Sequence, residues 1–116
     1  MKMQRDVKFT EARENLIAAL ECDIDHHTAR LMREKIDKML FERRPSVLIL
    51  DFSSVVFMDS SGLGLIMGRV ECATAIGARV ILRGMSPALT KLVHLCGIDR
   101  LQGLTLECER ERKSHI

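Results

Sequence analysis

The sequence contains no tryptophan or tyrosine and only four phenylalanines among its 116 residues. Its 18 lysines and arginines are nearly balanced by 16 aspartates and glutamates, which leaves a net charge of +2. Proteins that bind nucleic acids usually need clustered positive charge, and those that bind single strands also use aromatic side chains for stacking. The composition therefore argues against a nucleic-acid partner.

Long apolar runs are also missing. There is no stretch of about 18 apolar residues, the length that a transmembrane helix requires. Residues 1–9 (MKMQRDVKF) are charged, whereas the core of a signal peptide is apolar. We therefore expect a cytoplasmic protein with no membrane partner. The four cysteines form no C-x-x-C pair, so we expect them to be reduced and to serve as small core residues.

The length suits one domain. With 116 residues and a hydrophobic content of 47%, the chain can bury a single core but has no room for a second. We expect this domain to span residues 1–116, and residues 109–116 to form a polar, partly ordered tail.

Apolar spacing predicts the elements of this domain. Strands are expected at 7–10, 16–21, 47–52, 80–82 and 104–106, and helices at 28–42, at 60–76 and after the capping pair Ser86-Pro87. The alternation after residue 28 predicts an α/β fold, with a mixed sheet of four to five strands and helices packed mainly on one face. The apolar run at 47–52 is typical of a strand covered on both faces. The second helix is expected to turn four side chains inward: Leu63, Ile66, Met67 and Val70.

The most unusual segment is FMDSSGLG at 57–64, which opens the second predicted helix. Free backbone N–H groups and the helix dipole would stabilise a negative group placed on Ser60 or Ser61. The simpler alternative is that Asp59 or Ser60 only caps the helix. Gly62 and Gly64 lower helix propensity, and glycine there allows close approach by another backbone or a partner.

A second polar cluster, Asp25-His26-His27-Thr28, lies between the second strand and the first helix, with Asp23 just before it. These side chains could contribute to a metal site. The alternative is that Asp25 or Thr28 caps the helix and the histidines line its start.

These segments occur in a specific order. DHHTA at 25–29, FMDSSGLG at 57–64, SPA at 86–88 and LCG at 95–97 together resemble the sporulation-type anti-sigma F factor antagonists, which are STAS domains. The resemblance covers nearly the whole chain and implies the STAS fold. Two departures stand out. The chain has Cys22-Asp23-Ile24-Asp25 where the family usually has Gly-Glu-Leu-Asp, and residues 109–116 replace an amphipathic helix.

The resemblance implies a binding protein without catalysis or cofactor. In that family the unmodified antagonist binds an anti-sigma factor that is also a serine kinase, and this frees the sigma factor. The kinase then phosphorylates the antagonist at the serine that matches Ser60, and a PP2C-type phosphatase reverses the modification. The implied partner-binding residues are Asp23, Asp25, His26, Asp59, Ser61, Gly62 and Leu63.

The sequence leaves other functions open. STAS domains also act as scaffolds or nucleotide-binding regulatory modules in other signalling complexes. A metal-dependent phosphohydrolase built around Asp23, Asp25, His26 and His27 is a further alternative. The sequence does not distinguish a monomer from a weak dimer.

Overall fold

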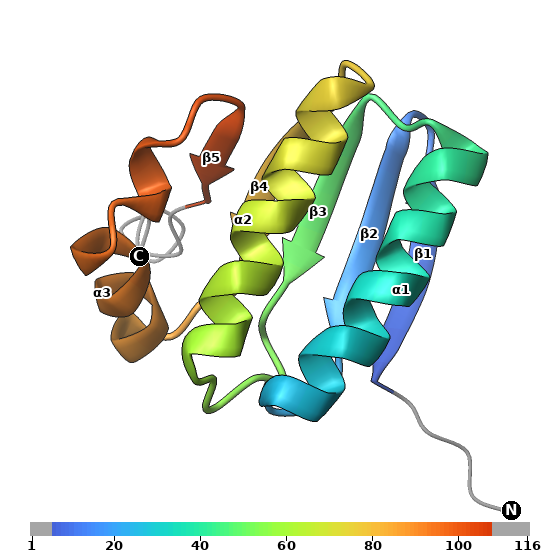
Figure 1. The fold of residues 1–116 in the computed structure, drawn as a ribbon. Coiled ribbons are helices and arrows are strands. Elements are labelled where there is room, and N and C mark those ends of the chain that lie inside the picture. Colours follow the sequence, from blue (N-terminus) through green and yellow to red (C-terminus); the bar gives the residue numbers. More distant parts are fainter. Residues whose placement is uncertain (1–5, 108–116) are drawn as a thin grey trace, which may run out of the picture.

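A computed structural model of the protein describes residues 6–107. Within this range five strands form one mixed sheet in the order β1-β2-β3-β4-β5, in which only β1 and β2 are antiparallel (Figure 1). The elements are β1 (Val7–Ala12), β2 (Asn15–Leu20), α1 (His26–Arg43), β3 (Val47–Asp51), α2 (Ser60–Ala75), β4 (Arg79–Arg83), α3 (Pro87–Leu95), the 3-10 helix η1 (Ile98–Arg100) and β5 (Leu104–Leu106). The predicted α/β fold is confirmed. Cys108 and the predicted polar tail lie outside the described residues.

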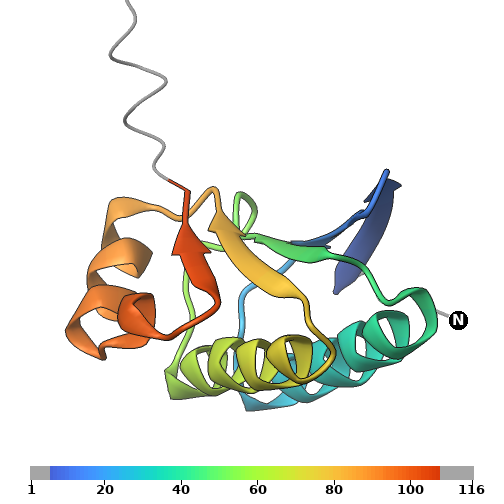
Figure 2. The ribbon, with the colours of Figure 1, turned by 90° about the horizontal axis from the view of Figure 1, so that it is seen from above.

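The helices lie mainly on one face of the sheet, as predicted. Seen along the sheet, α1 and α2 run side by side beneath the strands, and α3 flanks the edge at β5 (Figure 2). Both α1 and α2 follow the carboxyl end of a parallel strand, so their N-termini lie at the same edge of the sheet. None of the helices within residues 6–107 is long and apolar enough to cross a membrane.

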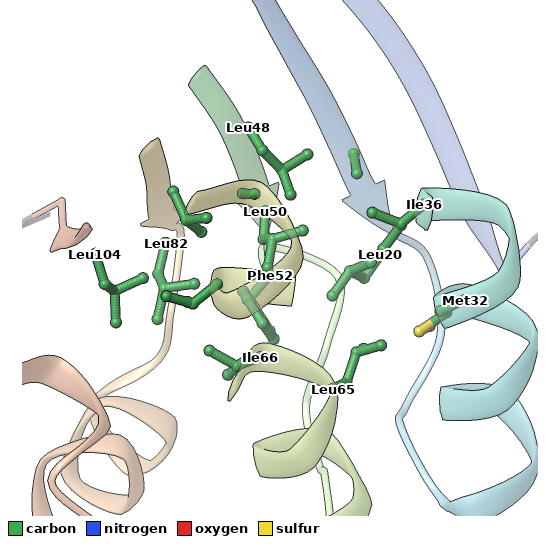
Figure 3. Packing of buried hydrophobic residues seen from close by; sticks show 14 of the residues in the cluster. Leu20, Met32, Ile36, Leu48, Leu50, Phe52, Leu65, Ile66, Leu82 and Leu104 are labelled. Atoms are coloured by element: carbon green, nitrogen blue, oxygen red, sulfur yellow. The ribbon is translucent and has the colours of Figure 1, made fainter. Parts of the chain in front are cut away.

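The core fills the layer between the sheet and these helices (Figure 3). Successive side chains of a strand point to opposite faces, so Leu48 and Leu50 of β3 face the helices and are fully buried. Around them lie further buried apolar side chains from the strands, the helices and the loop after β3, among them Leu20, Met32, Ile36, Leu65, Ile66, Phe52 and Leu82.

Ile49 shows that β3 is covered on both faces, as its apolar run predicts, although α1 and α2 lie on one face only. Because Leu48 and Leu50 face the helices, Ile49 points to the opposite face. That face carries no helix in the described part of the chain (Figure 2), yet Ile49 is only 4% exposed. Its register neighbours on β2 and β4 are Ile17 and Ile81. Neighbouring β-branched side chains therefore bury Ile49 without a second helical layer.

Two expectations about single side chains were wrong. Met67 is 49% exposed, because the inward face of α2 carries Leu65 and Ile66 and leaves Met67 on the other side. Cys72 and Cys96 are exposed and are therefore not core residues, whereas Cys22 is half-buried and packs against the core; all three are free thiols.

Burial of a charged side chain between α1 and α2 was not expected from the sequence. Arg69 of α2 is only 4% exposed, and its Nε lies 2.8 Å from Oδ1 of Asp37 on α1. The N–H is not aimed at that oxygen, so the contact is an ion pair rather than a hydrogen bond. A buried guanidinium needs a compensating charge, and Asp37 therefore joins the two helices at this point.

Candidate functional site

The two polar segments singled out in the sequence lie side by side at the carboxyl edge of the sheet. Ile24 forms an isolated parallel bridge with Met58. The amide of Ile24 donates to the carbonyl of Phe57 (3.0 Å), and the amide of Asp59 donates to the carbonyl of Ile24 (3.1 Å). The loop that enters α1 and the loop that enters α2 therefore form one unit.

Asp23 strengthens this junction. Its Oδ1 accepts hydrogen bonds from the amides of Val56 (2.9 Å) and Phe57 (3.1 Å). The bonded loop presents two large apolar side chains to solvent, since Val56 is 80% and Phe57 58% exposed. Asp23 thus positions the loop before α2.

Substitution of Asp23 should loosen this loop. We expect Asp23→Ala to lower the free energy of unfolding by about 1 kcal/mol, because two backbone donors lose a charged acceptor at an exposed site. Asp23→Asn keeps an acceptor oxygen and is the matched control. Urea unfolding gives the stability, and amide hydrogen exchange at residues 56 and 57 reports the loop. Unchanged exchange in Asp23→Ala would contradict the role assigned to this carboxylate.

Asp25 caps α1. Its Oδ1 accepts from the amide of Thr28 (2.9 Å), and the amide of Asp25 donates to the hydroxyl of Thr28 (2.9 Å), which completes a capping box. The capping alternative is therefore correct for this pair. His26 and His27, the first two residues of α1, are both exposed.

The Asp25 cap should make the free energy of unfolding depend on pH. The bond from the Thr28 amide holds the pKa of the Asp25 carboxyl below its ordinary value of 3.8. A carboxyl with a lower pKa in the folded chain stabilises the fold above its unfolded pKa and loses that contribution as the pH falls. The stability difference between the parent and Asp25→Ala should therefore be largest near neutrality and shrink below about pH 4. Urea unfolding across that range tests this, with Asp25→Asn as a non-titrating cap.

Asp59, rather than either serine, caps α2. Its carboxylate accepts from the amide of Ser61 (2.8 Å). Ser60, the first helical residue, is exposed, and its hydroxyl makes no hydrogen bond within residues 6–107. Ser61 is partly buried between the helices. The Ser61 hydroxyl makes no hydrogen bond within residues 6–107 either, so the two serines differ in exposure, and Ser60 is the more exposed.

Gly62 and Leu63 occupy different environments. Gly62 is buried, and a Cβ there would lie 2.6 Å from Sδ of Met58. The absent side chain therefore admits the chain's own Met58. Leu63 is half-buried on α2. By contrast, a Cβ on Gly64 would meet nothing within 4 Å, so Gly64, unlike Gly62, leaves open space in front of the helix.

The two aspartates that the metal-site alternative would require are engaged elsewhere. Asp23 holds the loop, and Asp25 caps α1. In the part of the chain that the structure describes, no group of three or more histidine, cysteine, aspartate or glutamate side chains could hold a metal ion.

A groove between α1 and α2 begins beside Ser61 and was not predicted from the sequence. Its cavity volume is about 430 Å³, and its lining is His26, Ala29, Arg30, Arg33, Ser61, Gly64, Leu65, Gly68 and Arg69. The signal was present in the sequence: Arg30 and Arg33 are three apart, and Gly64 and Gly68 are four apart, so each pair shares one helix face. Nothing in the sequence shows that these two faces meet.

The STAS domain profile matches residues 6–111. The chain belongs to the STAS domain family. It is 34% identical over 86 residues to the anti-sigma F factor antagonist of Lysinibacillus sphaericus, an alignment that covers 74% of each chain. This STAS domain is thus an anti-sigma factor antagonist, one of a class of non-enzymatic regulators.

Two solved structures of the antagonist SpoIIAA are similar to this STAS domain. The unphosphorylated form is 28% identical, covers 94% of each chain and has a TM-score of 0.70. The phosphorylated form, described as a Bacillus cell fate determinant, is 29% identical, covers 94% of this chain and 97% of its own, and has a TM-score of 0.68. This STAS domain therefore resembles both states of SpoIIAA to nearly the same degree.

Proposed function

We propose that the unmodified chain binds an anti-sigma factor that is also a serine kinase, and that this binding frees a sigma factor in the cytoplasm. Phosphorylation of Ser60 by the bound kinase ends the interaction, and a PP2C-type phosphatase restores it. The observation that carries this proposal is the state of Ser60. It is exposed and its hydroxyl makes no hydrogen bond within residues 6–107, because Asp59 already caps the helix.

The surroundings of Ser60 suit a docking surface. The joined loops bring Asp23, Asp25, His26, Asp59, Ser61, Gly62 and Leu63 to the same edge of the sheet. Exposed apolar side chains are characteristic of binding sites when they lie together, and Val56 and Phe57 are exposed just before α2. In this arrangement Asp23, Asp25 and Gly62 shape the surface, and the exposed side chains contact the partner.

The expected switch is electrostatic. A phosphate adds a charge of about −1.5 to −2, and a helix N-terminus stabilises such a charge by only about 0.3–1 kcal/mol. The fold should tolerate the modification, in line with the nearly equal similarity to both forms of SpoIIAA. Against a close partner surface, however, an unmatched charge costs several kcal/mol, and about 1.4 kcal/mol corresponds to a tenfold change in affinity.

The direct test is to incubate the chain with ATP and the serine-kinase anti-sigma factor of its own genome, and to locate added phosphate by peptide mass spectrometry. Phosphate on Ser60 supports the proposal. Phosphate on Ser61 alone would move the switch to the partly buried serine and refute the assignment. Tight binding without phosphate would indicate an antagonist that this kinase does not control.

A further inference from the structure

The groove between α1 and α2, termed the α1–α2 groove, is continuous with the proposed docking surface. Ser61 and His26 line its mouth, directly after Ser60 on α2 and Asp25 at the start of α1. The positive ends of both helix dipoles lie at this mouth. A partner that covers Ser60 would therefore also cover the entrance of the groove.

The groove carries uncompensated positive charge. Arg69 at its base is paired with Asp37. Arg30 has only a loose contact with Glu34, at 4.0 Å, and both of these side chains are more than 60% exposed. Arg33 is exposed and forms no ion pair within residues 6–107.

Carboxylates also lie near the mouth, and they are engaged locally. Asp25 and Asp59 cap the two helices, and each carboxylate accepts a hydrogen bond from a backbone amide. This leaves the guanidinium groups of Arg30 and Arg33 able to pair with an acidic group from outside. Arginine is well suited to that role, because its planar fork can bind a carboxylate through two parallel hydrogen bonds.

Gly64 and Gly68 make room on the α2 side of the groove. They are one turn apart and both line it, and a Cβ at either position would meet nothing within 4 Å. The packing of this chain therefore does not require glycine there, although alanine is the better helix former. The absent side chains allow another segment to approach α2 closely.

We propose that the α1–α2 groove receives an acidic segment of the anti-sigma factor kinase, with its carboxylates paired to Arg30 and Arg33 and its chain lying over Gly64 and Gly68. This inference rests on the proposed function and names a second contact area beside Ser60. A protein segment fits better than a small anion, because the arginines are exposed along an open groove that continues the docking surface.

Two double variants test the proposal by surface plasmon resonance with the immobilised kinase. Arg30→Glu with Arg33→Glu should raise the dissociation constant by roughly 10–100-fold through charge reversal. Its control is Lys38→Glu with Lys91→Glu, which changes the net charge equally at exposed positions outside the groove and should change affinity less than about threefold.

Gly64→Ala with Gly68→Ala is the second double variant. It should raise the melting temperature by roughly 5–10 °C and still weaken binding about tenfold or more, because two methyl groups occupy the contact. Greater stability with weaker binding cannot result from misfolding. Hydrogen exchange of the parent complex should also show protection at residues 29–33 and 64–68.

The outcomes separate the two proposals. If the parent binds and Ser60→Asp abolishes binding, but both groove variants bind like the parent, the groove proposal is wrong and the proposed function stands. If both charge-reversed pairs weaken binding equally, the effect is one of net charge and the groove proposal is again wrong. If the parent neither binds the kinase nor becomes phosphorylated, both proposals fail.

Discussion

Ser60→Asp is expected to weaken binding to the anti-sigma factor kinase by about 100-fold or more, because a fixed negative charge then faces the partner surface. The melting temperature should change by less than about 3 °C, since the first turn of a helix tolerates a carboxylate. Ser60 makes no side-chain hydrogen bond that the substitution could break in the described part of the chain. Isothermal titration calorimetry and thermal unfolding give the two values.

Two matched variants define the cause of that loss. Ser60→Ala removes the acceptor hydroxyl without adding charge, so it should bind like the parent and resist inactivation by ATP and kinase. Ser61→Asp places the same charge one residue later, on the partly buried serine, and should also lower the melting temperature. If Ser60→Asp binds the kinase as tightly as the parent, the proposed electrostatic switch is wrong.

Asp37→Ala is expected to cause a larger loss of stability than Asp23→Ala or Asp25→Ala, about 2–3 kcal/mol. The substitution leaves the guanidinium of Arg69, only 4% exposed, without its counter-charge. Arginine does not lose its proton in proteins, so the charge stays in the interface between α1 and α2. Because the Asp37 side chain is 38% exposed, water can reach part of the vacated site and keeps the loss below that of a fully buried pair. Urea unfolding at neutral pH measures the effect.

A double-mutant cycle separates charge from packing. Arg69→Met keeps much of the side-chain volume and removes the charge, so Asp37→Ala combined with Arg69→Met should regain most of the stability that Asp37→Ala loses. Additive losses in the double variant would show that the two side chains stabilise the fold independently. The ion pair between Asp37 and Arg69 would then not stabilise the contact between α1 and α2.

Much of the fold could be predicted because local signals agreed with the final packing. The pair Ser86-Pro87 predicted the start of α3, and Ser86 accepts a hydrogen bond from the amide of Leu89 (3.2 Å). The helices and strands followed from apolar spacing in the same way. Spacing also located the polar segments at the starts of α1 and α2, since chain segments that follow neighbouring parallel strands meet at one edge.

The remaining features depend on contacts between distant segments. Asp23 bonds to amides 33 and 34 residues away, and no local pattern indicates which carboxylate will do so. Arg69 has the sequence character of a surface residue, and its burial follows only from the approach of α1 with Asp37. Apolar spacing alone places Met67 in the core, because it allows more than one apolar face of α2, and only the packing of Leu65 and Ile66 selects one.

The division of roles between Asp59 and Ser60 has a genetic consequence. Because the cap is supplied by Asp59, replacement of Ser60 by a small uncharged residue without a hydroxyl group, such as alanine, should leave the fold intact. Under the proposed function, such alleles would encode an antagonist that accumulates normally and can no longer be switched off. Selection for permanently active transcription would therefore recover changes at Ser60, whereas selection for loss of the pathway would recover changes in the core and at Asp37.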